Sequence, residues 1–420
     1  MQNDINSERN LRRSLLASLV GAAGLGLAGC GGGDPEEVSN VLETASADAN
    51  EGLERQLATT NTPACNATGG VNTSGFDTKF NDYFKSVMGA ANKNGTVYKE
   101  LDSYYPGQYF SACIDPAAYG GNDGSGKTYT NTAKSEGQGY GMVLAVAAND
   151  RYKFDRLWNF TYYQMRRTDT NDAQRGFFDY LVTPYSKDAK GNAKRVGTGI
   201  APDGEIWIAT GLIMAWKRWN DTRYRNDAYS ILDALKRQYN NLFSGNVPRS
   251  WYDSPLTNPS YVNPAFFSYW NAVRPNNGWD KIITANRKLL VDAANAGGGL
   301  AFDWTNFDGT QYYGFSLPTG HGADAVRVAM NAALDTVWTG TTNHKAPSRK
   351  AVDKLNGKQD VAEFASAMYA TYALTGIGGC DSKVTPYTYR LLNNPLATGY
   401  YDGLLCTIAC GILSGRIKKF

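Results

Sequence analysis

The chain has 420 residues and a formal net charge of +3, and 42% of its residues are hydrophobic. A chain of this length forms one large domain or two small ones and can bury a sizeable core. Only 19% of the residues are charged, and this balanced composition argues against nucleic acid or an acidic polymer as a partner. The chain has only two histidines, His321 and His344, so we do not expect a histidine-based metal site.

Residues 1–29 have the layout of a secretory signal peptide. Three arginines precede an apolar run over residues 15–28, and the run leads into Leu-Ala-Gly-Cys, which ends at Cys30. The run is shorter than the roughly 20 residues that a membrane-spanning helix needs, so we expect cleavage of a signal. The Leu-Ala-Gly-Cys sequence resembles a bacterial lipoprotein signal. This resemblance implies cleavage before Cys30, lipidation of its thiol, and an exported protein anchored to a membrane in the periplasm or at the cell surface.

Residues 30–74 are rich in small and polar residues and show little apolar periodicity, which is typical of a flexible tether. No linker-like break follows, so we expect a single domain over residues 75–420. Apolar residues recur at helical spacing through this domain. The patterns cover residues 76–88, 142–148, 152–166, 205–219, 224–240, 263–273, 279–294, 323–338, 361–374 and 403–413. Strand patterns are scarce, which favours an all-α domain.

Five cysteines remain once Cys30 is set aside, and they are Cys65, Cys113, Cys380, Cys406 and Cys410. Export makes disulfides possible, but an odd number leaves at least one thiol unpaired and the spacing does not give the connectivity. Cys406 and Cys410 share a helix face. We expect them to be buried thiols, or separate partners for Cys380, rather than to pair with each other.

Three long loops, over residues 175–203, 246–263 and 297–324, carry many aromatic and acidic residues and lead to helix N-termini. Long loops in a compact domain are usually functional, so we expect these three to share one end of the helical assembly.

Three acidic residues stand where loops meet helices. Each has a purely structural interpretation: Glu136 next to a Ser135 N-cap, Asp203 as an N-cap, and Asp324 as the ion-pair partner of Arg327 one turn later. Three such acids among aromatic loops favour a different interpretation. Hydrolysis of a glycosidic bond needs two carboxyl groups, one protonated and one ionised.

Several blocks of the chain resemble the motifs of glycoside hydrolase family eight. The two most specific are Ser-Glu-Gly-Gln-Gly-Tyr-Gly-Met at 135–142 and Ala-Pro-Asp-Gly-Glu-Ile-Trp at 201–207. Similar blocks are Gly-Phe-Phe-Asp-Tyr at 176–180, Asn-Pro-Ser-Tyr at 258–261, Asp-Ala-Val-Arg at 324–327 and Tyr-Tyr-Asp-Gly-Leu-Leu at 400–405. The resemblance covers about residues 76–418. It implies a barrel of six α-helical hairpins with a substrate cleft across one end.

The resemblance also implies inverting hydrolysis of β-1,4-linked glycans, with no metal or cofactor. Glu136 matches the general acid, Asp324 matches the general base, and Asp203 matches the acid that binds the distorted sugar. Tyr261 matches the tyrosine that helps to hold the attacking water, and we expect Arg327 to orient Asp324. Inversion requires the two catalytic carboxyl groups to lie roughly 6.5–9.5 Å apart.

Three aromatic side chains, Tyr140, Tyr180 and Trp207, are further candidates for substrate contact. Tyr140 and the nearby glycine backbone would also give Glu136 partly apolar surroundings, which keep a carboxyl group protonated near neutral pH. For Trp207, core packing is an equally good interpretation. Tyr180 stands where the family often has tryptophan. His321, three residues before Asp324, would either contact substrate or fill space.

The glycan is less well determined than the chemistry. The blocks at 203–206, 218–221 and 259–261 look most like those of xylanases and reducing-end xylose-releasing enzymes, and Asp324 argues against a chitosanase. The alternative is an endo-1,4-β-glucanase that cleaves cellulose or mixed-linkage glucan. A second alternative is a surface lipoprotein that binds glycans without cutting them, and a third is a role in polysaccharide export. Residues 339–360, where a loop for exo-action would lie, look short, so exo and endo attack both stay open. We expect a monomer that meets the membrane only through its lipid.

Overall fold

The computed structural model describes residues 62–90, 94–116, 129–197, 199–314 and 320–420. The predicted signal peptide, Cys30 and the tether up to residue 61 lie outside the described residues. In the part of the chain that the structure describes, no helix is both long enough and apolar enough to cross a membrane.

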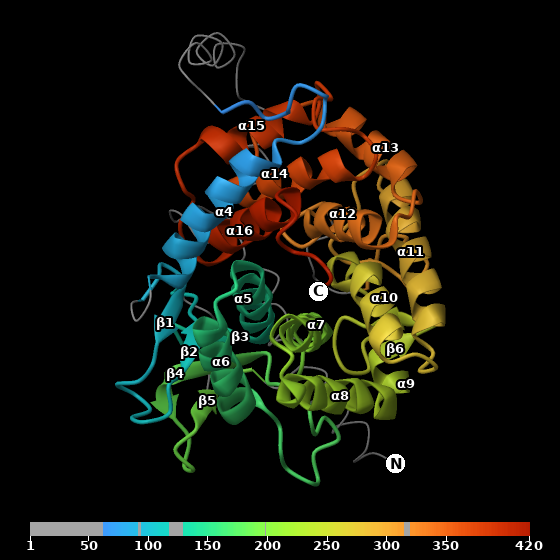
Figure 1. The fold of residues 1–420 in the computed structure, drawn as a ribbon. Coiled ribbons are helices and arrows are strands. Elements are labelled where there is room, and N and C mark those ends of the chain that lie inside the picture. The colour runs from blue at the N-terminus through green and yellow to red at the C-terminus, as the bar shows by residue number, and fades with distance from the viewer. Residues whose placement is uncertain (1–61, 91–93, 117–128, 198, 315–319) are drawn as a thin grey trace.

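Two concentric rings of helices make up the molecule (Figure 1). The inner ring consists of α5 (Ser135–Ala148), α7 (Pro202–Trp219), α10 (Pro264–Val273), α12 (Arg327–Thr339), α14 (Glu363–Ala370) and α16 (Tyr400–Leu413). The outer ring consists of α4 (Thr73–Met88), α6 (Arg151–Phe160), α8 (Thr222–Arg237), α11 (Trp279–Ala296), α13 (Lys345–Leu355) and α15 (Thr385–Asn393). Inner and outer helices alternate along the chain, which confirms the predicted all-α barrel of six helical hairpins.

The inner helices are buried nearly all round, because they face the barrel core on one side and the outer ring on the other. α5 and α7 illustrate how closely they approach. A Cβ atom at Gly139 would lie 2.5 Å from the Cβ of Trp207, and one at Gly204 would collide with the side chain of Ser135. Both positions therefore require glycine, and this close packing fixes the N-terminal end of α5 against that of α7.

Two outer helices, α13 and α15, have no counterpart among the predicted helices. Each carries a proline in its first turn, Pro347 in α13 and Pro386 in α15. In a sequence, proline usually indicates that a helix is interrupted. It is tolerated in the first turn, because the N–H groups of that turn make no hydrogen bond within the helix. The helix predicted over 323–338 also begins later, at Arg327, so that Asp324 lies in the turn before α12.

Short strands and small helices occupy the connections between the barrel helices. The strands are β1 (Tyr98–Glu100), β2 (Ser111–Cys113), β3 (Ala133–Lys134), β4 (Leu181–Lys187), β5 (Ala193–Arg195), β6 (Phe243–Ser244) and β7 (Val247–Pro248). The short helices are η1 (Thr161–Met165), α9 (Tyr239–Leu242), η2 (Pro259–Tyr261) and η3 (Thr371–Leu374). β3, β4 and β5 form one antiparallel sheet, in which Lys134 pairs with Leu181. Because β3 runs directly into α5, this sheet adjoins the N-terminal end of that helix.

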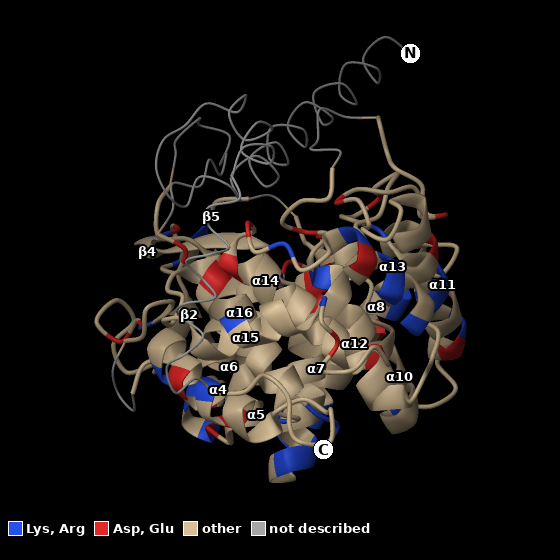
Figure 2. Cartoon of the chain, turned by 90° about the horizontal axis from the view of Figure 1, so that it is seen from above, with Lys and Arg blue, Asp and Glu red and all other residues tan. Residues whose placement is uncertain are grey.

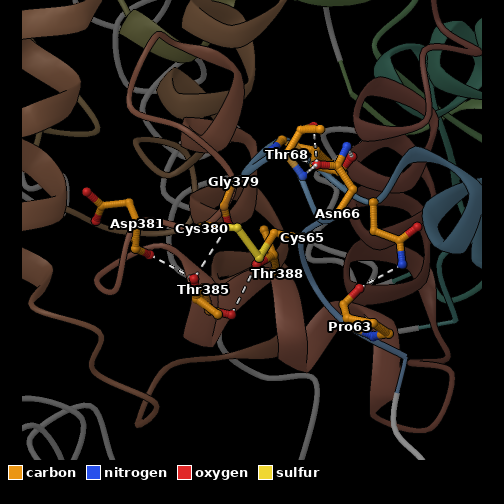
Figure 3. The surroundings of a disulfide bond; sticks show 12 residues. Pro63, Cys65, Asn66, Thr68, Gly379, Cys380, Asp381, Thr385 and Thr388 are labelled. Atoms are coloured by element: carbon orange, nitrogen blue, oxygen red, sulfur yellow. Dashed lines mark hydrogen bonds between the residues drawn. A yellow bond between two sulfur atoms is a disulfide. The ribbon is translucent and has the colours of Figure 1, made fainter.

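The segment 62–72, which was predicted to belong to a tether ending at residue 74, lies against the barrel instead. A disulfide joins Cys65 to Cys380 in the connection before α15 (Figure 3). The backbone N–H of Thr62 also donates to the Asn393 side chain at 3.0 Å. Cys406 and Cys410 are free and buried, which confirms that they do not pair with each other.

Basic and acidic side chains are interspersed over the outer helices and connections (Figure 2). Their mixture agrees with the small net charge of +3.

Candidate active site

The N-terminal ends of the inner helices bring the predicted acids together. Glu136 is the second residue of α5, Asp203 is the second residue of α7, and Asp324 lies in the turn that leads into α12. Tyr261 ends η2, just before α10, and Tyr400 is the first residue of α16. Since the positive end of a helix dipole favours negative charge, this end of the barrel is suited to hold several carboxylates. The prediction that the long loops meet at one end of the assembly is confirmed.

The N-caps expected in the purely structural interpretation of two of these acids are wrong, although both acids do lie in the first turn of a helix. Ser135 is not the N-cap of α5: the cap is Lys134, and the Ser135 hydroxyl is buried without a hydrogen-bond partner among the described residues. Asp203 is not the N-cap of α7 either, because Ala201 occupies that position. Both acids lie inside their helices, so capping does not account for them.

Arg327 is the centre of the cluster. Its Nη1 donates to Glu136 at 2.9 Å and to the Tyr140 hydroxyl at 2.7 Å, and its Nη2 donates to Asp324 at 2.6 Å. The same guanidinium lies 3.7 Å from Asp203. Its side chain is only 2% exposed, so these ion pairs are shielded from solvent. Arg327 was expected to orient Asp324, and it contacts all three predicted acids.

Glu136 and Asp324 each have a second hydrogen-bond donor. Tyr400 donates its hydroxyl proton to Glu136 at 2.8 Å, and the Asn258 amide donates to Asp324 at 2.7 Å. The Glu136 and Asp324 side chains are 17% and 28% exposed, whereas that of Asp203 is 3% exposed. Glu136 and Asp324 are therefore the two acids that an incoming ligand can reach, and Asp203 lies beneath them.

The protonation of the Glu136–Asp203 pair differs from the expectation. Burial raises the pKa of Asp203 well above its usual range, and the charge of Glu136 adds to this effect. Burial also acts to raise the pKa of Glu136, but the charges of Arg327 and Lys134 and the hydrogen bond from Tyr400 outweigh it and lower that pKa. A side-chain hydrogen bond joins the two carboxyl groups. These directions favour the neutral form on Asp203 and the ionised form on Glu136 in the free enzyme, whereas apolar surroundings alone were expected to keep Glu136 protonated.

Asp303 supports the turn that carries Asp324. It accepts the backbone N–H groups of Gly322 at 3.1 Å and Ala325 at 2.7 Å. A Cβ atom at Gly322 would collide with its carboxylate. Burial, followed by the nearby charge of Asp324, raises the pKa of Asp303 to about 7.

Two roles were considered for His321, substrate contact and space filling, and its contacts fit space filling. Its Nδ1 lies 2.7 Å from the Ala301 carbonyl oxygen, and its Nε2 lies 2.9 Å from the Tyr369 hydroxyl. Because a carbonyl can only accept, Nδ1 carries the proton and Nε2 accepts from the tyrosine. Both ring nitrogens are therefore used inside the protein, and burial lowers the pKa of His321.

Tyr140 and Trp207 lie beneath the site rather than on its surface. They are 1% and 2% exposed, and their rings meet edge to face at a centroid distance of 4.7 Å. Trp207 contacts Phe266 in the same way on its other side. The expected substrate contact is therefore corrected for both: Trp207 packs in the core, and Tyr140 accepts the hydrogen bond from Arg327.

Tyr261 and Tyr180 keep some exposure. Tyr261 is half-buried, and its ring centroid lies 5.8 Å from the guanidinium carbon of Arg327. Burial raises the pKa of Tyr261 well above its usual range, so its hydroxyl keeps its proton. Tyr180 is also half-buried and packs on a small apolar cluster formed by Tyr129, Leu181 and Val196.

Four residues of the site had no assigned role in the sequence interpretation: Lys134, Asn258, Asp303 and Tyr400. Asn258 and Tyr400 stand within blocks that carried the family resemblance, and this was the available signal for them. Lys134 directly precedes α5, and its ammonium lies 4.6 Å from the centroid of the Tyr400 ring. Nothing in the sequence distinguishes Asp303 from an ordinary loop acid, because its contacts depend on the path of the loop.

Comparison with known proteins agrees with this architecture. Residues 122–364 match the profile of the family described as glycosyl hydrolases family 8. A reducing-end xylose-releasing exo-oligoxylanase of Paenibacillus barcinonensis is 27% identical over 336 residues, which are 70% of this chain and 84% of the relative. An endoglucanase of Pseudomonas fluorescens is 30% identical over 188 residues, which are 42% of this chain and 46% of the relative.

Among solved structures, a cold-adapted family 8 xylanase superimposes with a TM-score of 0.71 at 24% identity, over 86% of this chain and 96% of that one. The likeness confirms the barrel fold.

The α/α barrel and the buried cluster of carboxyl groups around one arginine define a hydrolase that acts on glycosidic bonds. The chain belongs to glycoside hydrolase family 8.

Proposed function

We propose that this enzyme hydrolyses β-1,4-glycosidic bonds in xylan or xylo-oligosaccharides with inversion at the anomeric carbon. One observation carries the proposal: Glu136 and Asp324, the two more exposed acids, are held by the two terminal nitrogens of Arg327. Inverting hydrolysis needs two carboxyl groups with room for a sugar and a water between them. Two acids that are held by the two terminal nitrogens of one guanidinium support this arrangement.

Glu136 acts as the general acid in this proposal. The Glu136–Asp203 pair carries one proton, which rests on Asp203 in the free enzyme because burial favours the neutral form there. Glu136 is the more exposed of the two, so the proton reaches the leaving glycosidic oxygen through Glu136. Asp203 then becomes the ionised member and is stabilised by Arg327, 3.7 Å away.

Asp324 acts as the general base. Arg327 and Asn258 each donate to one of its oxygens, which fixes the carboxylate plane. A water between Asp324 and the anomeric carbon passes its proton to Asp324 as it attacks. Burial, and then the charges of Asp203 and Asp324, raise the pKa of Tyr261, so its hydroxyl stays neutral. This neutral hydroxyl is suited to hold the water.

Two classes of relative bear on the substrate. The exo-oligoxylanase relative aligns with a larger share of both chains, which favours xylan or its oligosaccharides. The endoglucanase relative keeps a β-1,4-glucanase as the second candidate. The connection between α13 and α14, at 356–362, is short, so the described residues offer no support there for a loop that closes one end of the cleft.

We also propose export followed by lipid anchoring at Cys30, in the periplasm or at the cell surface. The signal-like residues 1–29 motivate this proposal. The Cys65–Cys380 disulfide supports it, because such bonds persist in oxidising compartments outside the cytosol. Metabolic labelling with a palmitate analogue tests it: a Cys30→Ser variant should lose the label.

Incubation with xylohexaose and cellohexaose side by side tests the proposed reaction. We expect rapid loss of xylohexaose and an α-anomer as the first product by proton NMR. Xylose formed from the start indicates reducing-end exo-action, and mid-chain products indicate endo-action. Cleavage of cellohexaose alone would replace the xylanase proposal by the glucanase one, and a β-anomer as first product would refute inversion.

A further inference from the structure

A hollow of about 470 Å³ opens beside the sheet that leads into α5. Its walls come from three connections that are far apart in the sequence, before β2, before β3 and along β4. The lining residues are Tyr104, Tyr129, Thr130, Asn131, Thr183, Tyr185 and Ser186. A volume of this size lies in the range of small-molecule binding sites.

The lining is chemically uniform. Three tyrosine rings alternate with hydroxyl and amide side chains, and none of the lining residues carries a charge. Tyr104 and Tyr185 meet edge to face at a centroid distance of 4.7 Å, so each ring holds the other in place. Rigid aromatic faces suit the apolar faces of sugar rings, and hydroxyl and amide groups suit sugar hydroxyls. The hollow therefore fits a neutral carbohydrate better than an ionic ligand.

The hollow is connected to the active site through one face of the sheet. Lys134 and Leu181 are directly paired across β3 and β4, and side chains two residues apart on a strand share a face. Thr183 thus lies on the same face as Leu181, about 7 Å further along β4. The pairing becomes irregular beyond Thr183, before Lys187, and the consecutive residues Tyr185 and Ser186 both line the hollow there. Lys134, on that face, contacts the ring of Tyr400, whose hydroxyl donates to Glu136.

A second contact joins the hollow to the site. Tyr180, one of the predicted substrate-binding residues, packs in the same apolar cluster as Tyr129, which lines the hollow. Tyr180 and the hollow thus adjoin the same small cluster of side chains.

We propose that this hollow is a distal subsite for a neutral β-1,4-linked oligosaccharide, with Tyr104 and Tyr185 as its stacking platform. The inference rests on the proposed function for the direction in which the glycan runs. It assigns to these two tyrosines a role in chain-length selection: they bind sugars remote from the scissile bond. Their loss weakens the binding of long substrates and leaves short substrates unaffected.

The test compares Tyr104→Ala and Tyr185→Ala with the wild type on a hexasaccharide and a trisaccharide of the xylose and glucose series. We expect each substitution to lower kcat/KM on the hexasaccharide by about tenfold, the loss typical of a well-packed aromatic anchor, and to leave the trisaccharide value unchanged. Tyr185→Phe keeps the ring and should behave as the wild type.

Tyr152→Ala is the matched control, because Tyr152 is 44% exposed against 43% for Tyr104 but lies on the outer helix α6. Equal losses on both chain lengths, or no loss on the hexasaccharide, would overturn the proposal.

A binding measurement separates this inference from the proposed function. In the Glu136→Gln background, calorimetric titration with xylohexaose and cellohexaose reports affinity without turnover. We expect Tyr185→Ala to weaken binding about tenfold in that background, and unchanged affinity would overturn the subsite. If the wild type cleaves neither hexasaccharide, the proposed substrates are wrong, and the titration still decides whether the hollow binds them.

Discussion

Arg327 donates a hydrogen bond of 2.9 Å to Glu136, although 191 residues of sequence separate the two side chains. Its other terminal nitrogen donates to Asp324 at 2.6 Å. The two acids are therefore held by one planar group, and a planar guanidinium fixes the geometry of its partners more firmly than a flexible ammonium would. Substitutions at this cluster should change proton transfer and stability together.

Glu136→Gln and Asp324→Asn each remove one of the two proposed proton-transfer groups. We expect kcat on a hexasaccharide to fall by about 10²–10⁴-fold in either variant, the range that general acid–base catalysis contributes. Asp308→Asn, at an exposed acid in the loop before Asp324, should keep the wild-type kcat. A variant at Glu136 or Asp324 that turns over at the wild-type rate would remove that residue from its proposed role.

Asp203→Asn should move the alkaline limb of the kcat/KM profile to lower pH. In the wild type, burial raises the pKa of Asp203 and so keeps one proton on the pair at neutral pH. In the asparagine variant, only Glu136 can hold the proton that the leaving oxygen needs. The pKa of Glu136 is lowered, because Arg327 and other partners outweigh burial. A pH–rate series on one oligosaccharide measures the shift. An unchanged alkaline limb would show that Asp203 does not hold the proton.

Lys134→Met should move the same limb in the opposite direction. Burial acts to raise the pKa of Glu136, and the positive charge of Lys134 is one of the effects that lower it. Removing this charge raises the pKa of Glu136, so the Glu136–Asp203 pair keeps its one proton to higher pH. Lys187→Met, further along the same sheet, is a control that should leave the limb in place. A shift to lower pH in Lys134→Met would contradict the assignment.

Arg327→Met should destabilise the fold as well as abolish activity. It leaves three carboxyl groups without their buried cation, and breaking a buried pair from one side costs about 3–5 kcal/mol of unfolding free energy. Arg327→Lys keeps the charge but replaces the planar fork, whose two nitrogens hold the two acids, with a single flexible ammonium, so we expect it to retain more stability while kcat still falls. Urea unfolding followed by circular dichroism measures the first effect. Equal stability of the Met and Lys variants would argue against a charge-based role.

Loss of the disulfide should affect stability and leave the catalytic rate intact. Cys65 and Cys380 are separated by 315 residues, and a bond that closes a long loop typically contributes about 2–4 kcal/mol. A Cys65→Ser, Cys380→Ser double variant should therefore unfold at lower urea concentration than the wild type. Its kcat should be unchanged, because the bond lies in the connection from η3 to α15, on the side away from the inner-helix N-termini. A large fall in kcat would contradict this separation.

The sequence by itself determined the fold class, most of the helices, and the three acids with Arg327. Helical periodicity is a local property that is readable from single segments, and the family-like blocks carry the acids within a few residues. Local pattern failed at α13 and α15, where a proline in the first turn hid the helix. It also failed at residues 62–72, whose composition suggests a tether but which the disulfide to Cys380 holds on the barrel.

Only the tertiary structure decided how the acids share their proton and their partners. Three partners of Glu136, namely Arg327, Tyr400 and Asp203, come from other inner helices, so their effect on its pKa cannot be read from neighbouring residues. The exposure of Tyr140 and Trp207 is likewise set by the packing of α5 against α7, which buries both rings. The tyrosine-lined hollow also depends on tertiary structure, because its walls meet only when β4 pairs with β3. Local pattern fixes which residues form helices, and long-range packing fixes which of their side chains face a ligand.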